Sequence, residues 1–336
     1  MPAIESFLSA PSANPIRLLP SLSAAEWEER LSRWELPAST TEEAIIERAA
    51  RMVREAVDAN AWLVSEGVTV SAQGSYFNNT NVRQEADMDL RVTHPNLVII
   101  QDTSILGIDN VRQQQGYVFS SRTNGELAIL LRTNVHNALA VRFGASNITP
   151  GKKAFRISAI PGSRSDIDIV PAMRFHYITA REPSTPFAPP DLGPLEGIFI
   201  FGSDGSETIN FPQQHHRFGK SKRERTAYRF KKIVRMIKSL RDELVSAEVI
   251  APKELPSFLI ESLVYSVEDA HFMYTESRHS RLIRILTRVS QLCSNESWVA
   301  NAREINGIKM LFSPLQPWNI MDVRACIFLA LQRLGA

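Results

Sequence analysis

The chain has 336 residues, of which 44% are hydrophobic and 22% charged, and its net charge is +2. This composition excludes a disordered chain and a chain that is basic throughout. Cys293 and Cys326 are too few for a disulfide framework or a structural zinc site. Since the sequence shows no signal-peptide pattern and no apolar run of about 20 residues, we expect a cytoplasmic protein with no membrane segment.

The first two thirds of the chain mix helix and strand patterns. Residues 1–23 are rich in Ser and Pro and predict a loose arm. A capping box at Thr40 and Glu43 predicts a long helix that continues to about residue 64. The proline-rich residues 183–194 predict a loop. The other predicted elements are strands at 68–72 and 88–92, a helix at 126–143, strands at 155–160 and 167–170, and a hairpin formed by 197–201 and 207–211.

From residue 226 onward almost every segment has a helical pattern. The predicted helices are 226–245, 256–268, 278–292, 296–303 and 320–334. We therefore predict an α+β fold, with a core of mixed β-sheet and a long N-terminal helix over residues 24–215. A helical bundle over residues 216–336 follows it.

The strongest motif begins with Gly74-Ser75, after the first predicted strand, and ends with Asp87-x-Asp89 at the next one. Alternate strand residues point to the same side, so we expect both aspartates on one face of a sheet. Two carboxylates placed in this way can hold a hard cation such as Mg²⁺. The glycine allows the backbone to approach a phosphate, and the serine adds a hydroxyl group. Asp-x-Asp alone is also typical of a solvated strand.

A third carboxylate lies in Asp166-Ile-Asp168-Ile-Val-Pro, on another apolar strand. A charge in such a strand is costly unless a metal ion or an opposite charge compensates it. Three carboxylates are the set that two-metal phosphoryl transfer requires. Asp166 and Asp168 share one face, so their spacing does not choose between them.

A strongly basic segment occupies residues 219–241, with ten Lys or Arg and one acidic residue, Glu224. Its net charge is +9, so the rest of the chain carries −7. Lys231, Arg235 and Lys238 fall on one helix face and could bind the β- and γ-phosphates of a nucleotide. A solvated surface and a helix that grips nucleic acid are the alternatives.

Together, Gly74-Ser75, Asp87-x-Asp89 and the third strand aspartate resemble the nucleotidyltransferases of the DNA polymerase β superfamily. More narrowly, GSYFNNTNVRQEADMDL (74–90) and Asp168-Ile-Val-Pro171 resemble the cGAS/DncV-like nucleotidyltransferases of bacterial anti-phage defence. This resemblance favours Asp168 over Asp166. Segments 209–216, 229–241 and 255–267 resemble later parts of the same family, in the same order.

The resemblance also implies roles for individual residues. Asp87 and Asp89 would hold two Mg²⁺ ions, with Mn²⁺ as a substitute, and Asp168 would bind the ion that activates the attacking ribose hydroxyl. The donor triphosphate would be bound by Gly74, Ser75, Ser257 and one basic residue of the helix, with Lys231 preferred to Arg235 and Lys238. Ser257 follows a proline and could also be an N-cap, a role that does not exclude the phosphate contact.

Asn210 resembles the residue that reads uracil in the branch of the family that makes pyrimidine-containing cyclic dinucleotides. An amide donates and accepts at once, which suits a uracil edge, although a strand-end Asn can also satisfy a turn.

We therefore expect a polymerase-β-like core and a helical domain that completes the nucleotide cleft. The expected enzyme joins two nucleoside triphosphates, with UTP and ATP as the expected substrates, into a uridine-containing cyclic dinucleotide of the cyclic UMP-AMP or cyclic di-UMP type. This product signals to an effector protein. We expect a monomer that needs no extended nucleic acid. A nucleotidyltransferase acting on an RNA 3′ end or a small molecule is the first alternative. A non-enzymatic nucleic-acid-binding module is the second.

Overall fold

The computed structural model describes residues 19–82, 88–102, 116–118, 120–179 and 194–336. Asp87, the expected arm up to residue 18 and nearly all of the expected proline-rich loop lie outside these residues. The chain divides into two compact units, each with its own hydrophobic core. The sheet unit contains Ala38–Asn78 and Gln84–His216, and the helical unit contains Met1–Pro37, Asn79–Arg83 and Arg217–Ala336.

The sheet unit is built on a mixed seven-stranded sheet. Its strands are β1 (Thr69–Ala72), β2 (Met88–Gln101), β3 (Ile148–Pro150), β4 (Phe155–Ile157), β5 (Ile167–Ile178), β6 (Leu195–Phe201) and β7 (Glu207–Asn210). The path β1-β2-β5-β4-β3 has one parallel pair, β2 with β5, while β6 pairs with β5 and β7 with β6. The predicted strands and the hairpin are confirmed, and β3 was not predicted.

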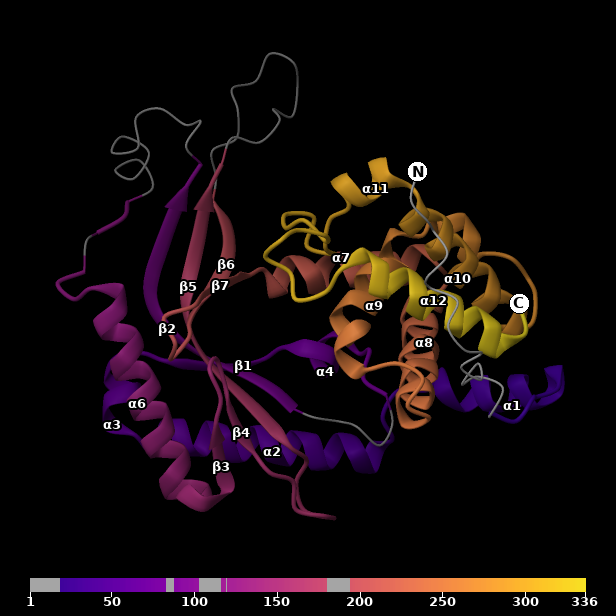
Figure 1. Cartoon of the computed structure of the whole chain (residues 1–336). Helices are drawn as coiled ribbons and strands as arrows, with labels where there is room; N and C mark the ends of the chain where they lie inside the picture. The colour runs from indigo at the N-terminus through magenta and orange to yellow at the C-terminus, as the bar shows by residue number, and fades with distance from the viewer. Residues whose placement is uncertain (1–18, 83–87, 103–115, 119, 180–193) are drawn as a thin grey trace, which may run out of the picture. The chain divides into compact units, whose positions relative to one another are not determined.

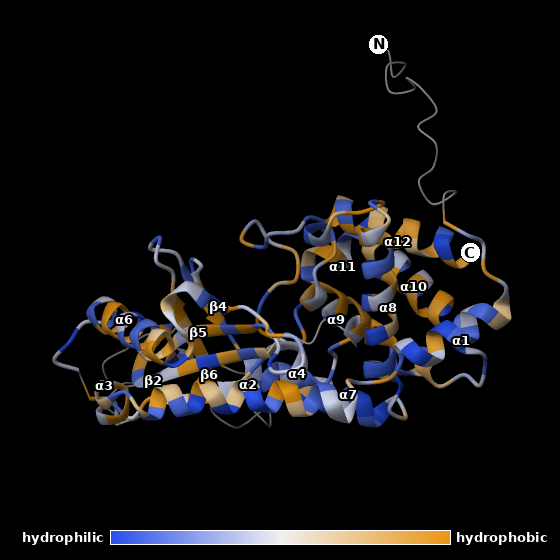
Figure 2. Cartoon of the chain, turned by 90° about the horizontal axis from the view of Figure 1, so that it is seen from below, coloured by the Kyte–Doolittle hydropathy of each residue, from blue (hydrophilic) through white to orange (hydrophobic). Residues whose placement is uncertain are grey.

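Helices cover one face of this sheet (Figure 1). They are α2 (Thr40–Asp58), α3 (Ala61–Ser65) and α6 (Asn124–Phe143). Apolar residues of α2 and α6 share a core with alternate residues of β2 and β5, such as Leu90 and Ile169. Figure 2 shows hydrophobic and hydrophilic residues alternating along α2, as expected for a helix with one buried side.

The first long helix differs in detail from its prediction. Ser39 is the N-cap and forms the capping box with Glu42, one residue earlier than the predicted pair. The helix ends at Asp58, and Asn60 caps the separate helix α3 by accepting a hydrogen bond from the Leu63 amide. The sequence pattern missed this break because the apolar spacing continues across it.

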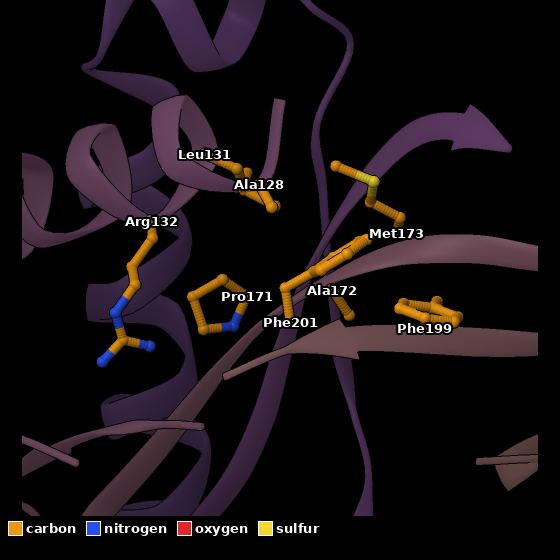
Figure 3. Close-up of a pocket in the computed structure, with 8 residues that line it drawn as sticks. All are labelled: Ala128, Leu131, Arg132, Pro171, Ala172, Met173, Phe199 and Phe201. Atoms are coloured by element: carbon orange, nitrogen blue, oxygen red, sulfur yellow. The ribbon is translucent and has the colours of Figure 1, made fainter. Parts of the chain in front are cut away.

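The face of the sheet next to α6 is tightly filled. Figure 3 shows the residues around a small gap on this side, including Leu131 of α6 and Met173 of β5. The gap measures only about 10 Å³, room for a single water molecule at most. Together with the shared core of α2, α6 and the strands, this shows that α6 packs closely on the sheet.

The helical unit is a bundle whose core includes residues from helices far apart in the sequence. Its helices are α1 (Ala24–Trp34), α8 (Arg229–Ser246), α9 (Ser257–Ser266), α10 (Arg278–Ser294), α11 (Glu296–Asn301) and α12 (Ile320–Leu334). The five predicted C-terminal helices are confirmed. Helix α1 was not predicted, and it contributes Trp27 and Leu31 to the core of this unit.

Helix α7 (Pro212–Arg225) was also not predicted, because it is polar on every side and has no apolar period. The chain passes from the sheet unit to the helical unit within α7. The mixed sheet and the helical C-terminal part confirm the predicted α+β class. None of the described helices combines the length and the apolar character that a membrane span requires.

Candidate active site

Two aspartates lie side by side on the open face of the sheet. Asp89 of β2 and Asp168 of β5 are direct partners in the parallel register. Adjacent strands are about 4.8 Å apart, and the neighbours Leu90 and Ile169 point into the core, so both aspartates point away from α2 and α6. Both side chains are half-buried. Two carboxylates this close repel each other, and an oxygen-only ligand set suits a hard divalent cation. Asp87 lies outside the described residues.

Asp166 and Asp168 have different surroundings, although they share one strand face in the sequence. Asp166 accepts a hydrogen bond from the Ala159 amide at 2.8 Å and pairs with Arg156 at 3.1 Å, so it holds a loop in place. Burial raises the pKa of Asp168, Arg156 lowers it and Asp166 raises it. The structure therefore places Asp168, and not Asp166, beside Asp89.

Gly74 packs directly against Asp89. It begins the short helix α4 (Gly74–Asn78) with a φ of +67°, a conformation that L side chains rarely adopt. A Cβ atom at this position would lie 2.6 Å from the Asp89 Cγ. Any other residue would therefore move the carboxylate or the helix. Ser75 is the next residue of α4 and is half-buried.

The same open face contains a hollow of about 170 Å³. Polar residues from three neighbouring strands line it, namely Thr69 and Ser71 of β1, Arg91 and Thr93 of β2, and Arg174 of β5. Ile198 of β6 also lines it and is the strand partner of Asn210, the last residue of β7. The residue expected to read a base is therefore next to this hollow in the sheet.

In the helical unit, the three cations on the face of α8 have different partners. Lys238 is 2% exposed, and its Nζ lies 2.6 Å from the Glu261 Oε1 and 3.0 Å from the Thr80 carbonyl oxygen. The Thr80 hydroxyl donates to the same glutamate oxygen at 2.6 Å. Lys238 is thus the cation of a buried network that holds the segment following α4.

Arg235 holds the same segment. Its Nε donates to the Glu35 carbonyl oxygen at 2.8 Å and its Nη1 to the Asn79 carbonyl oxygen at 2.7 Å. Asn79 has a φ of +52°, and these bonds stabilise its unusual backbone conformation.

Lys231 differs from both. It is 6% exposed, and among the described residues no carboxylate lies within ion-pair distance of its ammonium group. Burial and, to a smaller extent, the positive charges of Arg223, Arg235 and Lys220 together lower its pKa to about 8, while Glu261 opposes this effect. A buried cation with no counter-ion is a good candidate for binding an anion.

Ser257 is the first residue of α9, and its Oγ accepts a hydrogen bond from Arg241 at 3.1 Å. The N-cap is Pro256, so the alternative in which Ser257 caps the helix is wrong.

The sequence reasoning missed Arg91 and Thr93. They continue the alternation that begins at Asp89, and a charged residue in an otherwise apolar strand could have pointed to them.

Comparison with known proteins identifies the family. The model of the cGAS/DncV-like nucleotidyltransferase C-terminal helical domain matches residues 217–334. The chain is 31% identical over 307 residues to a cyclic dipyrimidine nucleotide synthase CdnE of Legionella pneumophila, covering 91% of this chain and 97% of the relative. It is 28% identical over 252 residues to a cyclic UMP-AMP synthase of Rhodothermus marinus, covering 73% and 77%.

Solved structures share the fold. The Rhodothermus marinus CdnE c-UMP-AMP synthase with Apcpp and Upnpp has a TM-score of 0.71 at 22% identity, covering 90% of this chain and 94% of that one. The Elizabethkingia meningoseptica CdnE cyclic dinucleotide synthase with GTP and Apcpp has a TM-score of 0.69 at 24% identity, covering 92% and 99%. This fold and the 31% identity to a full-length relative confirm the expected resemblance. The chain is therefore a nucleotidyltransferase that belongs to the cGAS/DncV-like family.

Proposed function

We propose that this enzyme condenses two nucleoside triphosphates into a cyclic dinucleotide, releases pyrophosphate twice, and uses UTP and ATP as substrates. The observation that carries the proposal is the register of Asp89 opposite Asp168, on an open sheet face with Gly74 packed against it. The names of the relatives support a uridine-containing product. By the family resemblance, the product is a second messenger of anti-phage defence that an effector protein reads.

Enzymes of this family generally depend on a divalent metal ion. Asp89 and Asp168 fit Mg²⁺, because two half-buried carboxylates in register supply the oxygen ligands that this ion prefers. With Asp87, they would hold two such ions, which Mn²⁺ could replace. Bound there, Mg²⁺ lowers the pKa of the attacking ribose hydroxyl and neutralises the leaving pyrophosphate.

The remaining work is positioning. Gly74 keeps space for the Asp89 carboxylate, and the Ser75 hydroxyl would contact the donor triphosphate. In the helical unit, Lys231 would bind the same triphosphate together with Ser257. Arg235 and Lys238 would act indirectly, because both hold the segment at Asn79 and Thr80.

The proposal is tested by the product formed from an equimolar mixture of ATP, GTP, CTP and UTP with Mg²⁺. Mass spectrometry should find a cyclic dinucleotide that contains uridine, and the same reaction without the enzyme should contain none. If product appeared only after an RNA or a small-molecule acceptor was added, the proposal would be wrong and a transferase acting on that acceptor would replace it.

A non-enzymatic nucleic-acid-binding module is less well supported by the structure. Such a module needs a continuous cationic surface. On α8, however, Arg235 and Lys238 are buried and occupied by partners. Lys222 and Arg225 of α7 both pair with Asp269. Several positive charges of residues 219–241 are thus bound by partners inside the helical unit.

Lys231 predicts a specific pH dependence. Because its pKa is about 8, its ammonium group loses the proton as the pH rises through that value, and triphosphate binding weakens. We expect kcat/KM to fall about 25-fold between pH 7.5 and 9.5, in proportion to the protonated fraction of Lys231, since this parameter reports the free enzyme. Lys231→Arg keeps its charge over the whole range and should remove this decrease. An identical decrease in the variant would exclude Lys231 as its origin.

A further inference from the structure

The hollow on the open sheet face contains polar groups that have no partner. Arg91 is 8% exposed, and within the described parts of the chain its Nη1 atom has no hydrogen-bond acceptor. Thr93 is 9% exposed, and its Oγ1 atom is also unpartnered there. Leaving such groups unsatisfied is costly, and most buried polar groups in proteins have a partner. Both residues line the hollow, so a ligand in it is the natural partner.

The position of the hollow relates it to the proposed reaction. Arg91 and Thr93 are two and four residues beyond Asp89 on β2 and share its face, about 7 and 13 Å along the strand. A nucleoside whose ribose hydroxyl lay at the aspartates could place its base at this distance, in the hollow. Ile198 lines the hollow and belongs to a small apolar cluster with Val170, Ala172 and Ile200 of β5 and β6. Its side chain provides an apolar contact for the flat face of a ring.

The size and polarity of the hollow restrict the ligand. Its volume of about 170 Å³ is close to that of a cavity of about 150 Å³ that accommodates benzene, so it has room for one six-membered ring. A guanidinium group only donates hydrogen bonds, whereas a hydroxyl both donates and accepts. The complementary ring carries a carbonyl oxygen beside an N–H group, as uracil does. Cytosine has an amino group where uracil has this carbonyl oxygen, and that group would face the donors of Arg91.

We propose that this hollow binds the base of one substrate nucleotide, and that Arg91 and Thr93 select uracil over cytosine there. The inference rests on the proposed function, because it assumes that a nucleotide lies with its ribose at Asp89. Arg91 would donate to a carbonyl oxygen of the base and Thr93 would accept from its ring N–H. Asn210, paired with Ile198 beside the hollow, would then be one of several groups that read the base.

The test compares Arg91→Met and Thr93→Val with the wild-type enzyme in a reaction containing ATP and equal amounts of UTP and CTP. The ratio of uridine to cytidine in the product should fall about tenfold or more in Arg91→Met and severalfold in Thr93→Val. Arg142→Met is the matched control, because Arg142 is an exposed arginine of α6 that does not line the hollow. Its product ratio should stay within about twofold of wild type.

Binding of non-hydrolysable UTP and CTP analogues, measured by calorimetry, separates this inference from the proposed function. Loss of the preference for the UTP analogue in Arg91→Met would support base reading even if no cyclic product formed. An unchanged preference in both Arg91→Met and Thr93→Val would overturn the inference while leaving the cyclase assignment intact. An equal loss of affinity for both analogues would also overturn it, because Arg91 would then bind a group other than the base. Thermal melting shows whether each variant is still folded. Thr93→Val keeps the shape of the side chain and removes only its hydroxyl group.

Discussion

Asp89→Asn and Asp168→Asn should each lower kcat by at least about a thousandfold, while the protein stays folded. An amide keeps the shape of the carboxylate but loses the charge that holds a cation, and metal ions supply several kcal/mol of transition-state stabilisation. Stability should be kept or increased, because burial raises the pKa of Asp168 and its ionised form is therefore unfavourable in the fold. The rate of pyrophosphate release measures kcat, and thermal melting measures the stability of the fold.

Asp166→Asn is the matched control for this experiment. The substitution is the same and lies two residues away, but Asp166 is paired with Arg156 and with the Ala159 amide. We expect its activity to stay within about tenfold of wild type, since a partly exposed ion pair contributes about 1 kcal/mol or less. Equal losses in Asp166→Asn and Asp168→Asn, or full activity in Asp168→Asn, would contradict the placement of the metal.

Lys238→Met should destabilise the helical unit by about 3–5 kcal/mol. Lys238 and Glu261 are both almost fully buried, and their closest atoms are 2.6 Å apart. Removing the lysine leaves the glutamate charge buried without the cation that neutralises it, although the Thr80 hydroxyl still donates to its Oε1 atom. Urea unfolding followed by tryptophan fluorescence measures the effect. All tryptophans except Trp62 belong to this unit.

Lys231→Met is the control on the same helix. Lys231 is also buried, but no carboxylate pairs with it in the described chain. Its pKa is about 8 in the fold and about 10.4 in an unfolded chain, so between these values the unfolded state binds more protons and stability rises with pH. At neutral pH the methionine removes this cost, so Lys231→Met should be as stable as wild type or more stable, yet it should lose triphosphate binding. Equal destabilisation of both variants would contradict this distinction.

A second variant at the same pair provides a further check. Lys238→Met combined with Glu261→Leu removes both charges, so it should recover much of the stability that the single variant loses. If the double variant were as unstable as the sum of the two single ones, the two charges would not be coupled, and the network would have to be explained by packing alone.

Most elements could be predicted because their signals are local. The apolar spacing in α6, α8 and α10 comes from one side of each helix that faces a core. Helix α7 has no such side, and α1 is an isolated amphipathic segment near the N-terminus whose partner helices are about 200 residues away. Helix α7 could therefore not be found from a local pattern, whereas α1 carries local signals that the prediction overlooked, namely a capping box at Ser23 and Glu26 and the apolar pair Trp27 and Leu31.

The site was partly predictable for the same reason. The spacing of Gly74, Ser75, Asp87 and Asp89 is a local signature, and the positive face of α8 follows from helical periodicity. The choice between Asp166 and Asp168, and among Lys231, Arg235 and Lys238, depends on partners distant in sequence. Arg156, Glu35, Thr80 and Glu261 are those partners.

The sequence by itself determined which residue types could form a metal site, a phosphate site and a helical bundle. Its net charge of +2 is the sum of +9 on residues 219–241 and −7 on the rest of the chain. This uneven distribution indicated a ligand that carries phosphates. Only the tertiary structure decided which of these charges are already neutralised by partners. Strand register placed Asp168 beside Asp89, and buried partners occupied Lys238 and Arg235 but not Lys231. The physical reason is that the cost of a buried charge depends on its neighbours in space, which the order of residues along the chain does not contain.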